Sequence, residues 1–104
     1  MQKLIYTTII LFLFISCEKP EHKIRFKNDF TQVITSIAVG DATYGTVPIG
    51  SITEYKSIDK GKFSIDGRTA SGIIAGSGKV RGRGKHNWTV TLDASSKLSL
   101  KEDK

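Results

Sequence analysis

The chain has 104 residues, with 16 lysines and arginines against 10 aspartates and glutamates, a formal net charge of +6 and a single cysteine. A chain of this length builds one small domain and leaves no room for a second, and one cysteine excludes a disulfide within the chain, so a hydrophobic core must supply the stability. The basic balance suits a phosphate-rich membrane surface, an acidic polysaccharide or a nucleic acid as partner.

The first residues have the pattern of an export signal. Lys3 is followed by an apolar run over residues 4–15, and a positive residue ahead of about 7–15 apolar residues is typical of a secretory signal peptide. The run is too short to span a bilayer, because a membrane-crossing helix takes about 20 apolar residues. We therefore predict a signal helix over residues 1–16. Since an exported protein rarely meets nucleic acid, we expect no nucleic-acid partner.

The end of this signal resembles the bacterial lipobox. Ser16 and Cys17 follow the apolar run, although Phe14 stands where the motif usually has leucine. The resemblance implies that Cys17 is acylated and becomes the N-terminus after cleavage, which leaves 104 − 16 = 88 residues. Each buried CH₂ of the acyl chains would contribute about 0.8 kcal/mol to membrane binding. Glu18 and not aspartate follows the cysteine, and by resemblance to known lipoprotein sorting rules this implies the outer membrane. The alternative is an ordinary signal peptide with an incidental cysteine.

Strand-like patterns fill the chain after a charged tether over residues 17–22. In residues 23–27, Ile24 and Phe26 alternate with charged residues, and this period of two is typical of a half-buried strand. Similar segments continue to residue 101, and we expect residues 102–104 to fray.

Turn signals separate these segments. Asp66 and Gly67 form the strongest two-residue hairpin signal, and Pro48 ends a short segment over residues 43–47 because proline cannot donate to a sheet ladder. No stretch after residue 22 has apolar residues at helical spacing. Besides the short segment, the predicted strands cover residues 23–27, 33–39, 52–58, 62–65, 68–75, 88–92 and 97–101.

About seven short strands with close turns predict an all-β fold, a small antiparallel β-sandwich over residues 23–101. We expect it to be a monomer. The predicted core consists of apolar residues on the inner faces of the strands. These are Ile24, Phe26, Val33, Ile37, Val39, Ile52, Phe63, Ile65, Trp88, Val90, Leu92 and Leu98.

One set of motifs resembles a known group of proteins. Residues 44–50 (YGTVPIG) are followed by residues 53–55 (TEY) and 61–65 (GKFSI). A turn glycine, an aromatic residue on the next strand and a glycine-led hairpin are the pattern of small exported bacterial lipoproteins with an immunoglobulin-like or transthyretin-like β-sandwich. The resemblance implies a fold, but it implies no activity and no functional residue.

The sequence contains no recognisable catalytic or metal-binding arrangement. His22 lies in the tether and His86 at the end of a basic segment, and neither has a neighbour in sequence that suggests a nucleophile–base pair. Several aspartates fall in predicted turns, where this residue type caps its own backbone, and no spacing of ligands matches a metal site. We therefore expect a protein that is not an enzyme and takes no cofactor.

The segment over residues 76–86 combines glycines with cations. Lys79, Arg81, Arg83 and Lys85 recur with period two, so an extended ribbon would present all four on one side. Such a stripe could bind phosphate or sulfate groups, to which arginine makes paired hydrogen bonds. In the alternative hypothesis, the segment is a flexible, solvated hairpin whose charges keep a sheet edge from aggregating.

These patterns together predict a lipid-anchored β-sandwich of the bacterial envelope. The first hypothesis is a non-catalytic structural or protein-interaction module, with another envelope protein as its partner. The second is a binding module for anionic envelope glycan or lipopolysaccharide through residues 76–86.

Overall fold

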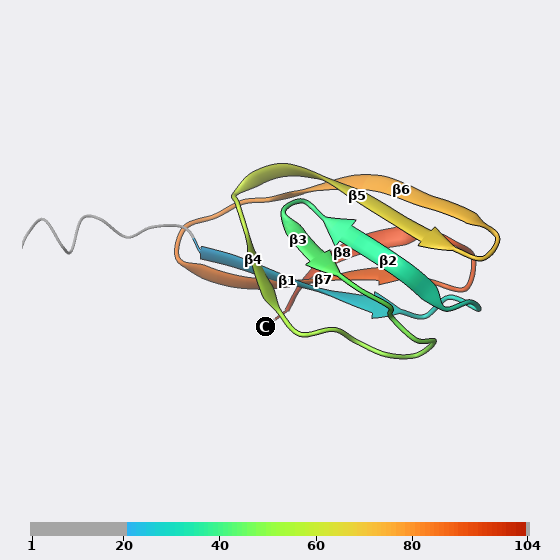
Figure 1. Ribbon diagram of the computed structural model, residues 1–104. Coiled ribbons are helices and arrows are strands. Elements are labelled where there is room, and N and C mark those ends of the chain that lie inside the picture. The colour runs from blue at the N-terminus through green and yellow to red at the C-terminus, as the bar shows by residue number, and fades with distance from the viewer. Residues whose placement is uncertain (1–20, 104) are drawn as a thin grey trace, which may run out of the picture.

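The structure, a computed structural model, describes residues 21–103, so the predicted signal helix over residues 1–16 and Cys17 lie outside the described residues. Residues 21–103 form eight strands and no helix (Figure 1), and this part of the chain therefore contains no helix that could cross a membrane. The strands are β1 (Glu21–Asn28), β2 (Ile34–Val39), β3 (Ala42–Tyr44), β4 (Lys56–Ile58), β5 (Gly61–Thr69), β6 (Gly72–Val80), β7 (Lys85–Leu92) and β8 (Leu98–Asp103).

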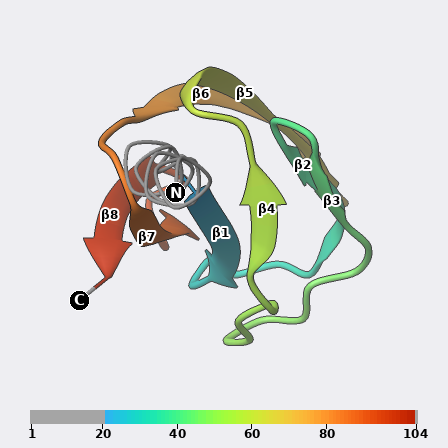
Figure 2. The same cartoon turned by 90° about the vertical axis from the view of Figure 1, so that its left-hand side faces the viewer.

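The strands form two four-stranded sheets. The first sheet has the order β4-β1-β7-β8 and the second has the order β3-β2-β5-β6. Seen from the end at which β1 begins, the two sheets enclose one interior (Figure 2). The prediction of an all-β fold with two facing sheets is confirmed.

One strand pair differs from the predicted antiparallel arrangement. β1 pairs with β7 in parallel along its whole length, from Glu21 opposite Lys85 to Asn28 opposite Leu92. A tight hairpin cannot join parallel neighbours, and here most of the chain lies between them. The first sheet is therefore mixed.

The core occupies the space between the sheets, and most of its predicted members are confirmed. Ile24, Phe26, Val90 and Leu92 of the first sheet are completely buried, because alternate residues of a strand point to the same face. Trp88 and Leu98 are partly buried and pack against this core. The other predicted members that are buried are Ile37, Val39, Phe63 and Ile65.

Two predicted core residues are exposed. Val33 is 42% exposed and precedes β2, in which the buried residues are Ile34, Ile37 and Val39. The pairing of β2 with β5 is irregular between Ile34 and Ser36, and such a bulge changes which residues of a strand face the core.

The second exposed residue lies in a long connection. Ile52 is 45% exposed and makes only an isolated bridge to Lys27. The strand predicted over residues 52–58 is confined to β4, so the inward alternation expected of a strand does not reach Ile52.

The strongest predicted hairpin is wrong. Asp66 and Gly67 lie inside β5, opposite Ala38 and Ile37 of β2, and the chain turns only at residues 70–71. Gly67 is buried, and a Cβ atom there would lie 2.5 Å from Cδ1 of Ile37. The glycine is therefore required by close packing between strands rather than by a turn.

The domain is longer at both ends than predicted. His22, assigned to the tether, is only 2% exposed and belongs to β1. Asp103, assigned to a frayed tail, belongs to β8 and accepts hydrogen bonds from the hydroxyl groups of Tyr55 at 2.7 Å and Thr89 at 2.6 Å. These contacts fix residues that the sequence pattern alone left outside the domain.

Candidate functional site: a basic loop held by two histidines

The basic segment is not one continuous ribbon. Residues 76–80 complete β6 and pair with β5, whereas Lys85 and His86 begin β7 in the other sheet. Only residues 81–84 are loop, and they carry the chain from the second sheet to the first. The four predicted cations therefore do not line one side of a single extended segment.

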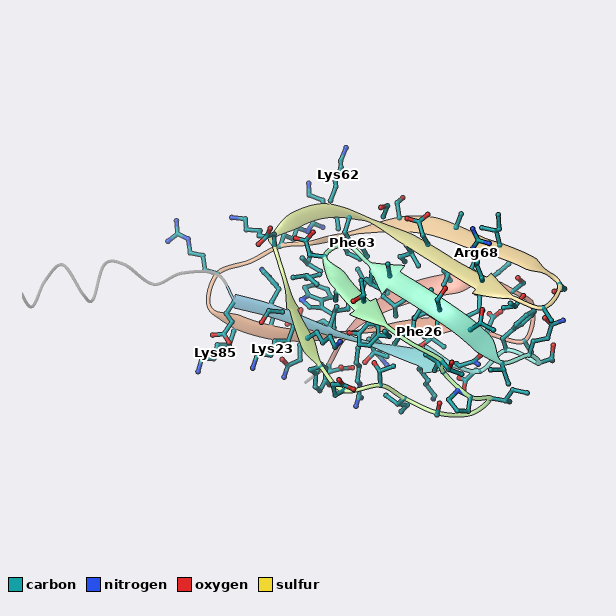
Figure 3. All side chains as sticks on the ribbon, in the orientation of Figure 1. Lys23, Phe26, Lys62, Phe63, Arg68 and Lys85 are labelled. Atoms are coloured by element: carbon teal, nitrogen blue, oxygen red, sulfur yellow. The ribbon has the colours of Figure 1, made fainter. Side chains whose placement is uncertain are left out.

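The four cations nevertheless gather at one end of the sandwich. Lys79 lies near the end of β6, Lys85 starts β7, and Arg81 and Arg83 lie on the loop between them, all four exposed. Lys62 of β5 is directly opposite Lys79. Figure 3 shows Lys85 at the end where β1 begins and Lys62 above the first part of β5. We call Lys62, Lys79, Arg81, Arg83 and Lys85 the basic end.

The basic end has no acidic partner in the described structure. The ion pairs within residues 21–103 involve Lys23, Arg25, Lys27 and His86, and none of the five cations. Their charges therefore remain available to a ligand in solution or on a surface.

The loop backbone is held through three consecutive carbonyl groups. The Glu21 amide donates to the Gly84 carbonyl at 2.8 Å. His22 Nε2 lies 3.3 Å from the Gly82 carbonyl, and His86 Nε2 lies 2.6 Å from the Arg83 carbonyl. Strands β1 and β7 thus position the loop on which the two exposed arginines sit.

Gly82 allows this close approach. Its φ of +114° is in the region that favours glycine, and a Cβ atom at this position would lie 2.9 Å from Nε2 of His86. A side chain at position 82 would therefore disturb both the loop conformation and the histidine contact.

His22 is a buried member of the cluster, and both of its ring nitrogens have hydrogen-bond partners. The indole N–H of Trp88 donates to Nδ1 of His22 at 3.0 Å, so the imidazole carries its proton on Nε2 and donates to the Gly82 carbonyl. The rings of His22 and His86 stack with centroids 5.3 Å apart. Both nitrogens of a 2% exposed side chain are therefore satisfied.

His86 favours the charged form. Nδ1 lies 2.6 Å from a carboxylate oxygen of Glu102, and Nε2 faces the Arg83 carbonyl. Both neighbours are acceptors, and only an imidazolium can donate to both. The Glu102 hydrogen bond, followed by that of the Arg83 carbonyl, raises the pKa of His86 above its usual value.

A second polar cluster lies on the outer face of the first sheet. The Arg25 guanidinium lies 4.7 Å from the centre of the Tyr55 ring, and its Nε donates to Thr89 at 3.0 Å. Partial burial works to raise the pKa of Asp103, but the hydrogen bonds from Thr89 and Tyr55 outweigh it and lower the pKa below the usual value. These groups satisfy one another and stabilise the end of β8.

The geometry of the two histidines suits positioning of the loop better than catalysis or metal binding. Among residues 21–103, neither imidazole has a hydrogen bond to a hydroxyl or thiol that it could activate. No three histidine, cysteine or acidic side chains in this range group closely enough to hold a metal ion. What the arrangement offers is a fixed loop that presents cations to an anionic partner.

The four cations were predicted from the sequence as candidate site residues, but His22 and His86 were not. His22 and Ile24 lie on one face of β1, and His86 and Trp88 lie on one face of β7. Extending the alternation two residues upstream from each apolar run would have placed both imidazoles on the inner face. Their contact with each other depends on the parallel pairing of β1 and β7.

Comparisons with known proteins support the fold. No protein-family model matches the chain, and no curated protein matches it. Similar solved structures include an NMR structure of a protein from Eubacterium rectale, with a TM-score of 0.53, 22% identity, and coverage of 80% of this chain and 88% of that one. At this identity the similarity shows a shared fold and nothing about activity.

Proposed function

We propose that the chain is a lipid-anchored β-sandwich protein of the bacterial outer membrane, held by an acylated Cys17 and serving as a non-catalytic structural or protein-interaction module. The signal-like pattern of residues 1–17 supports the anchor. The observation that carries the proposal is the position of β1. Its first residue, Glu21, comes four residues after Cys17 and is hydrogen-bonded to the loop of the basic end.

This arrangement suits a protein fixed to a membrane. The sandwich begins almost directly after the proposed acylation site, so no long linker separates the domain from the bilayer. The end closest to the anchor carries exposed cations, which suit a surface rich in phosphate. The polar groups inside that end are engaged with one another, in keeping with a binding or structural role.

The anchor is tested by changing Cys17 to serine in the full chain expressed in a bacterium. The unchanged protein should partition into the detergent phase, and its N-terminal peptide should carry acyl mass. Cys17→Ser should remain an uncleaved precursor or enter the aqueous phase. Ser16→Ala is the matched control, because it keeps a small residue before the cysteine. Unchanged partitioning of Cys17→Ser, with no acyl mass on the original protein, would contradict the proposal.

A second candidate function is binding of an anionic envelope glycan or lipopolysaccharide phosphate. It is favoured by the exposure of Lys79, Arg81, Arg83 and Lys85 and by the lack of acidic partners for them among the described residues. Arginine guanidinium groups bind phosphate and sulfate through paired hydrogen bonds.

This second function predicts salt-dependent retention on an anionic polysaccharide column. Arg81→Ser with Arg83→Ser should reduce retention while changing the free energy of unfolding by less than about 0.5 kcal/mol, as for most exposed substitutions. Arg68→Ser with Lys97→Ser removes the same charge elsewhere and should leave most of the retention. Equal retention of all three proteins would exclude the basic end as the binding site.

A further inference from the structure

We infer that the basic end docks on the anionic lipid headgroups of the bilayer that holds the anchor, so that the sandwich stands on residues 81–84. The inference rests on the proposed lipid anchor and identifies the ligand of the same basic surface.

Chain length places the loop close to the membrane. Cys17 and Glu21 are four residues apart, and an extended chain spans at most about 3.6 Å per residue, so their separation cannot exceed about 14 Å. The Glu21 amide contacts the Gly84 carbonyl at 2.8 Å. The field of an anionic membrane surface falls off over a Debye length, about 8 Å at physiological salt. An acylated Cys17 therefore keeps this loop within about two Debye lengths of the surface even when the connecting residues are fully extended, and closer when they are not.

The charge distribution orients the domain. Residues 79–86 contain four cations and no acid, and two nearby carboxylates are already paired, Glu21 with Lys23 at 3.8 Å and Glu102 with His86 at 2.6 Å. The turns beside Lys62 add Asp41 and Asp59, together with Lys60.

The opposite end of the sandwich has a different charge. Its loops, residues 29–33, 70–71 and 93–97, contain two aspartates and one lysine, Lys97. With Arg68 close to the turn over residues 70–71, the two aspartates are balanced by two cations. An anionic surface therefore attracts the end that carries the anchor more strongly than the other.

The loop is prepared for this contact. Three successive carbonyls, those of Gly82, Arg83 and Gly84, are bound from the protein side. A loop that is already fixed loses less conformational entropy when it meets its partner. The exposed Arg81 and Arg83 side chains are thus presented by a backbone that need not rearrange.

The contact is electrostatic and stays at headgroup level. The only apolar residue of the segment over residues 79–86 is Val80, which is completely buried in the core. Without an exposed apolar side chain, the loop gains nothing from entering the hydrocarbon layer. Binding should therefore weaken with salt.

The test uses the mature lipoprotein reconstituted into vesicles of phosphatidylcholine alone or mixed with phosphatidylglycerol. Hydrogen–deuterium exchange of residues 79–88 should be slower on the anionic vesicles, and the difference should vanish in about 0.5 M salt, where screening is strong. Each cation near an anionic surface contributes about fivefold to binding. Replacing Arg81 and Arg83 by glutamate should therefore reduce the equilibrium constant for docking by at least about 25-fold and abolish the protection.

The matched control is Arg68→Glu with Lys97→Glu, which makes the same change in net charge away from the basic end and should keep the protection. Equal exchange on both kinds of vesicle, or equal loss of protection in both double variants, would overturn the inference. Equal protection by a soluble anionic polysaccharide without vesicles would also overturn it, in favour of glycan binding.

The proposed anchor and the proposed headgroup contact can be tested separately. If the N-terminal peptide carries no acyl mass, the proposed anchor is wrong, and flotation of the same protein with the two kinds of vesicle tests the headgroup contact by itself. Flotation with anionic vesicles, lost in the Arg81→Glu and Arg83→Glu double variant, would still support that contact. Equal recovery with both vesicles would overturn it.

Discussion

At the scale of single residues, Trp88 joins the core to the candidate site. It is partly buried against the core and gives its indole N–H to Nδ1 of His22. An apolar ring would fill much of the same space but would leave that buried nitrogen without its donor. The packing of Trp88 and its hydrogen bond can therefore be separated by mutation.

Trp88→Phe should lower the free energy of unfolding by about 1–3 kcal/mol, because it leaves the buried Nδ1 of His22 unsatisfied. Trp88→Ala should cost more, about 3 kcal/mol or above, since it also removes most of the buried ring. Urea denaturation followed by circular dichroism measures both values. Equal stability of Trp88→Phe and the original protein would mean that the hydrogen bond contributes nothing.

His86 should titrate above its usual pKa, which is about 6.5. Its pKa is raised in the folded state by Glu102 and by the Arg83 carbonyl, so the contact stabilises the fold fully below the unfolded pKa. This stabilisation is lost as pH rises through the folded pKa. NMR of the imidazole Cε1 proton measures the midpoint, and Glu102→Gln should lower it. A midpoint that does not respond to Glu102→Gln would contradict the assigned cause.

At the scale of elements, β5 shows that a turn-like dipeptide can lie inside a continuous strand. Asp66 and Gly67 have the composition of a turn, yet β5 continues through them between β2 and β6. Space explains the glycine, since a Cβ atom would lie 2.5 Å from Cδ1 of Ile37 and 3.0 Å from the Ser36 carbonyl.

Gly67→Ala should therefore destabilise the domain by about 1–3 kcal/mol, the usual cost of overpacking a buried site. Gly45→Ala is the control, because a Cβ atom at Gly45 would meet nothing within 4 Å. It should change stability by less than about 0.5 kcal/mol. Thermal or urea unfolding measures the stability of the two variants. Equal stabilities would show that β2 can shift to accommodate the added methyl group without a loss of stability.

The edge strand β6 is not guarded in the way that the sequence suggested. Arg81 and Arg83 lie beyond the strand, and Lys79 is the only charged residue within it. Ile73 on the same strand is 75% exposed. Edge strands without charges are prone to pair with other chains, so β6 is the place where a guarding charge would have an effect.

Ile73→Lys should slow aggregation at high protein concentration, because an edge lysine opposes strand pairing. Stability should change by less than about 0.5 kcal/mol. Ser64→Lys adds the same charge to β5, which is paired on both sides, and should have a smaller effect. Static light scattering over time measures both rates. Equal slowing by the two variants would mean that net charge matters and the edge does not.

At the scale of the whole molecule, two sheets are held together without a disulfide. The chain has one cysteine, Cys17, outside the described residues, so cohesion comes from the shared core and from contacts between sheets. One such contact is the hydroxyl of Tyr44 on β3, which donates to the carbonyl of Ile24 on β1. Burial raises the pKa of Tyr44 to about 12, so the hydroxyl stays protonated and able to donate even in alkaline solution.

Tyr44→Phe should cost about 1–3 kcal/mol, because it removes the donor of a buried carbonyl group. Tyr55→Phe is the control: its hydroxyl also donates a hydrogen bond, to Asp103, but on the outer face of the first sheet. It should cost less, since water can replace the lost partner. Urea unfolding measures the free energy of unfolding of both variants. An equal loss would mean that the hydrogen bond between the sheets contributes no more to stability than the one on the outer face.

The sequence by itself determined the local features of this protein. Alternation marked Ile24, Phe26, Val90 and Leu92 as core, because the side-chain period of a strand depends only on the backbone of that strand. The all-β class followed for the same reason. The cations of residues 79–85 were also evident, since charge is a property of composition.

The tertiary structure decided what depends on partners distant in sequence. Trp88 and His22 are 66 residues apart and meet only because β7 lies parallel to β1, a choice set by the order of strands in the sheet. Gly67 is explained by Ile37 of a neighbouring strand. The candidate site depends on both sequence and tertiary structure. Its cations can be identified from the sequence, whereas the contacts that hold its loop exist only when both sheets have formed.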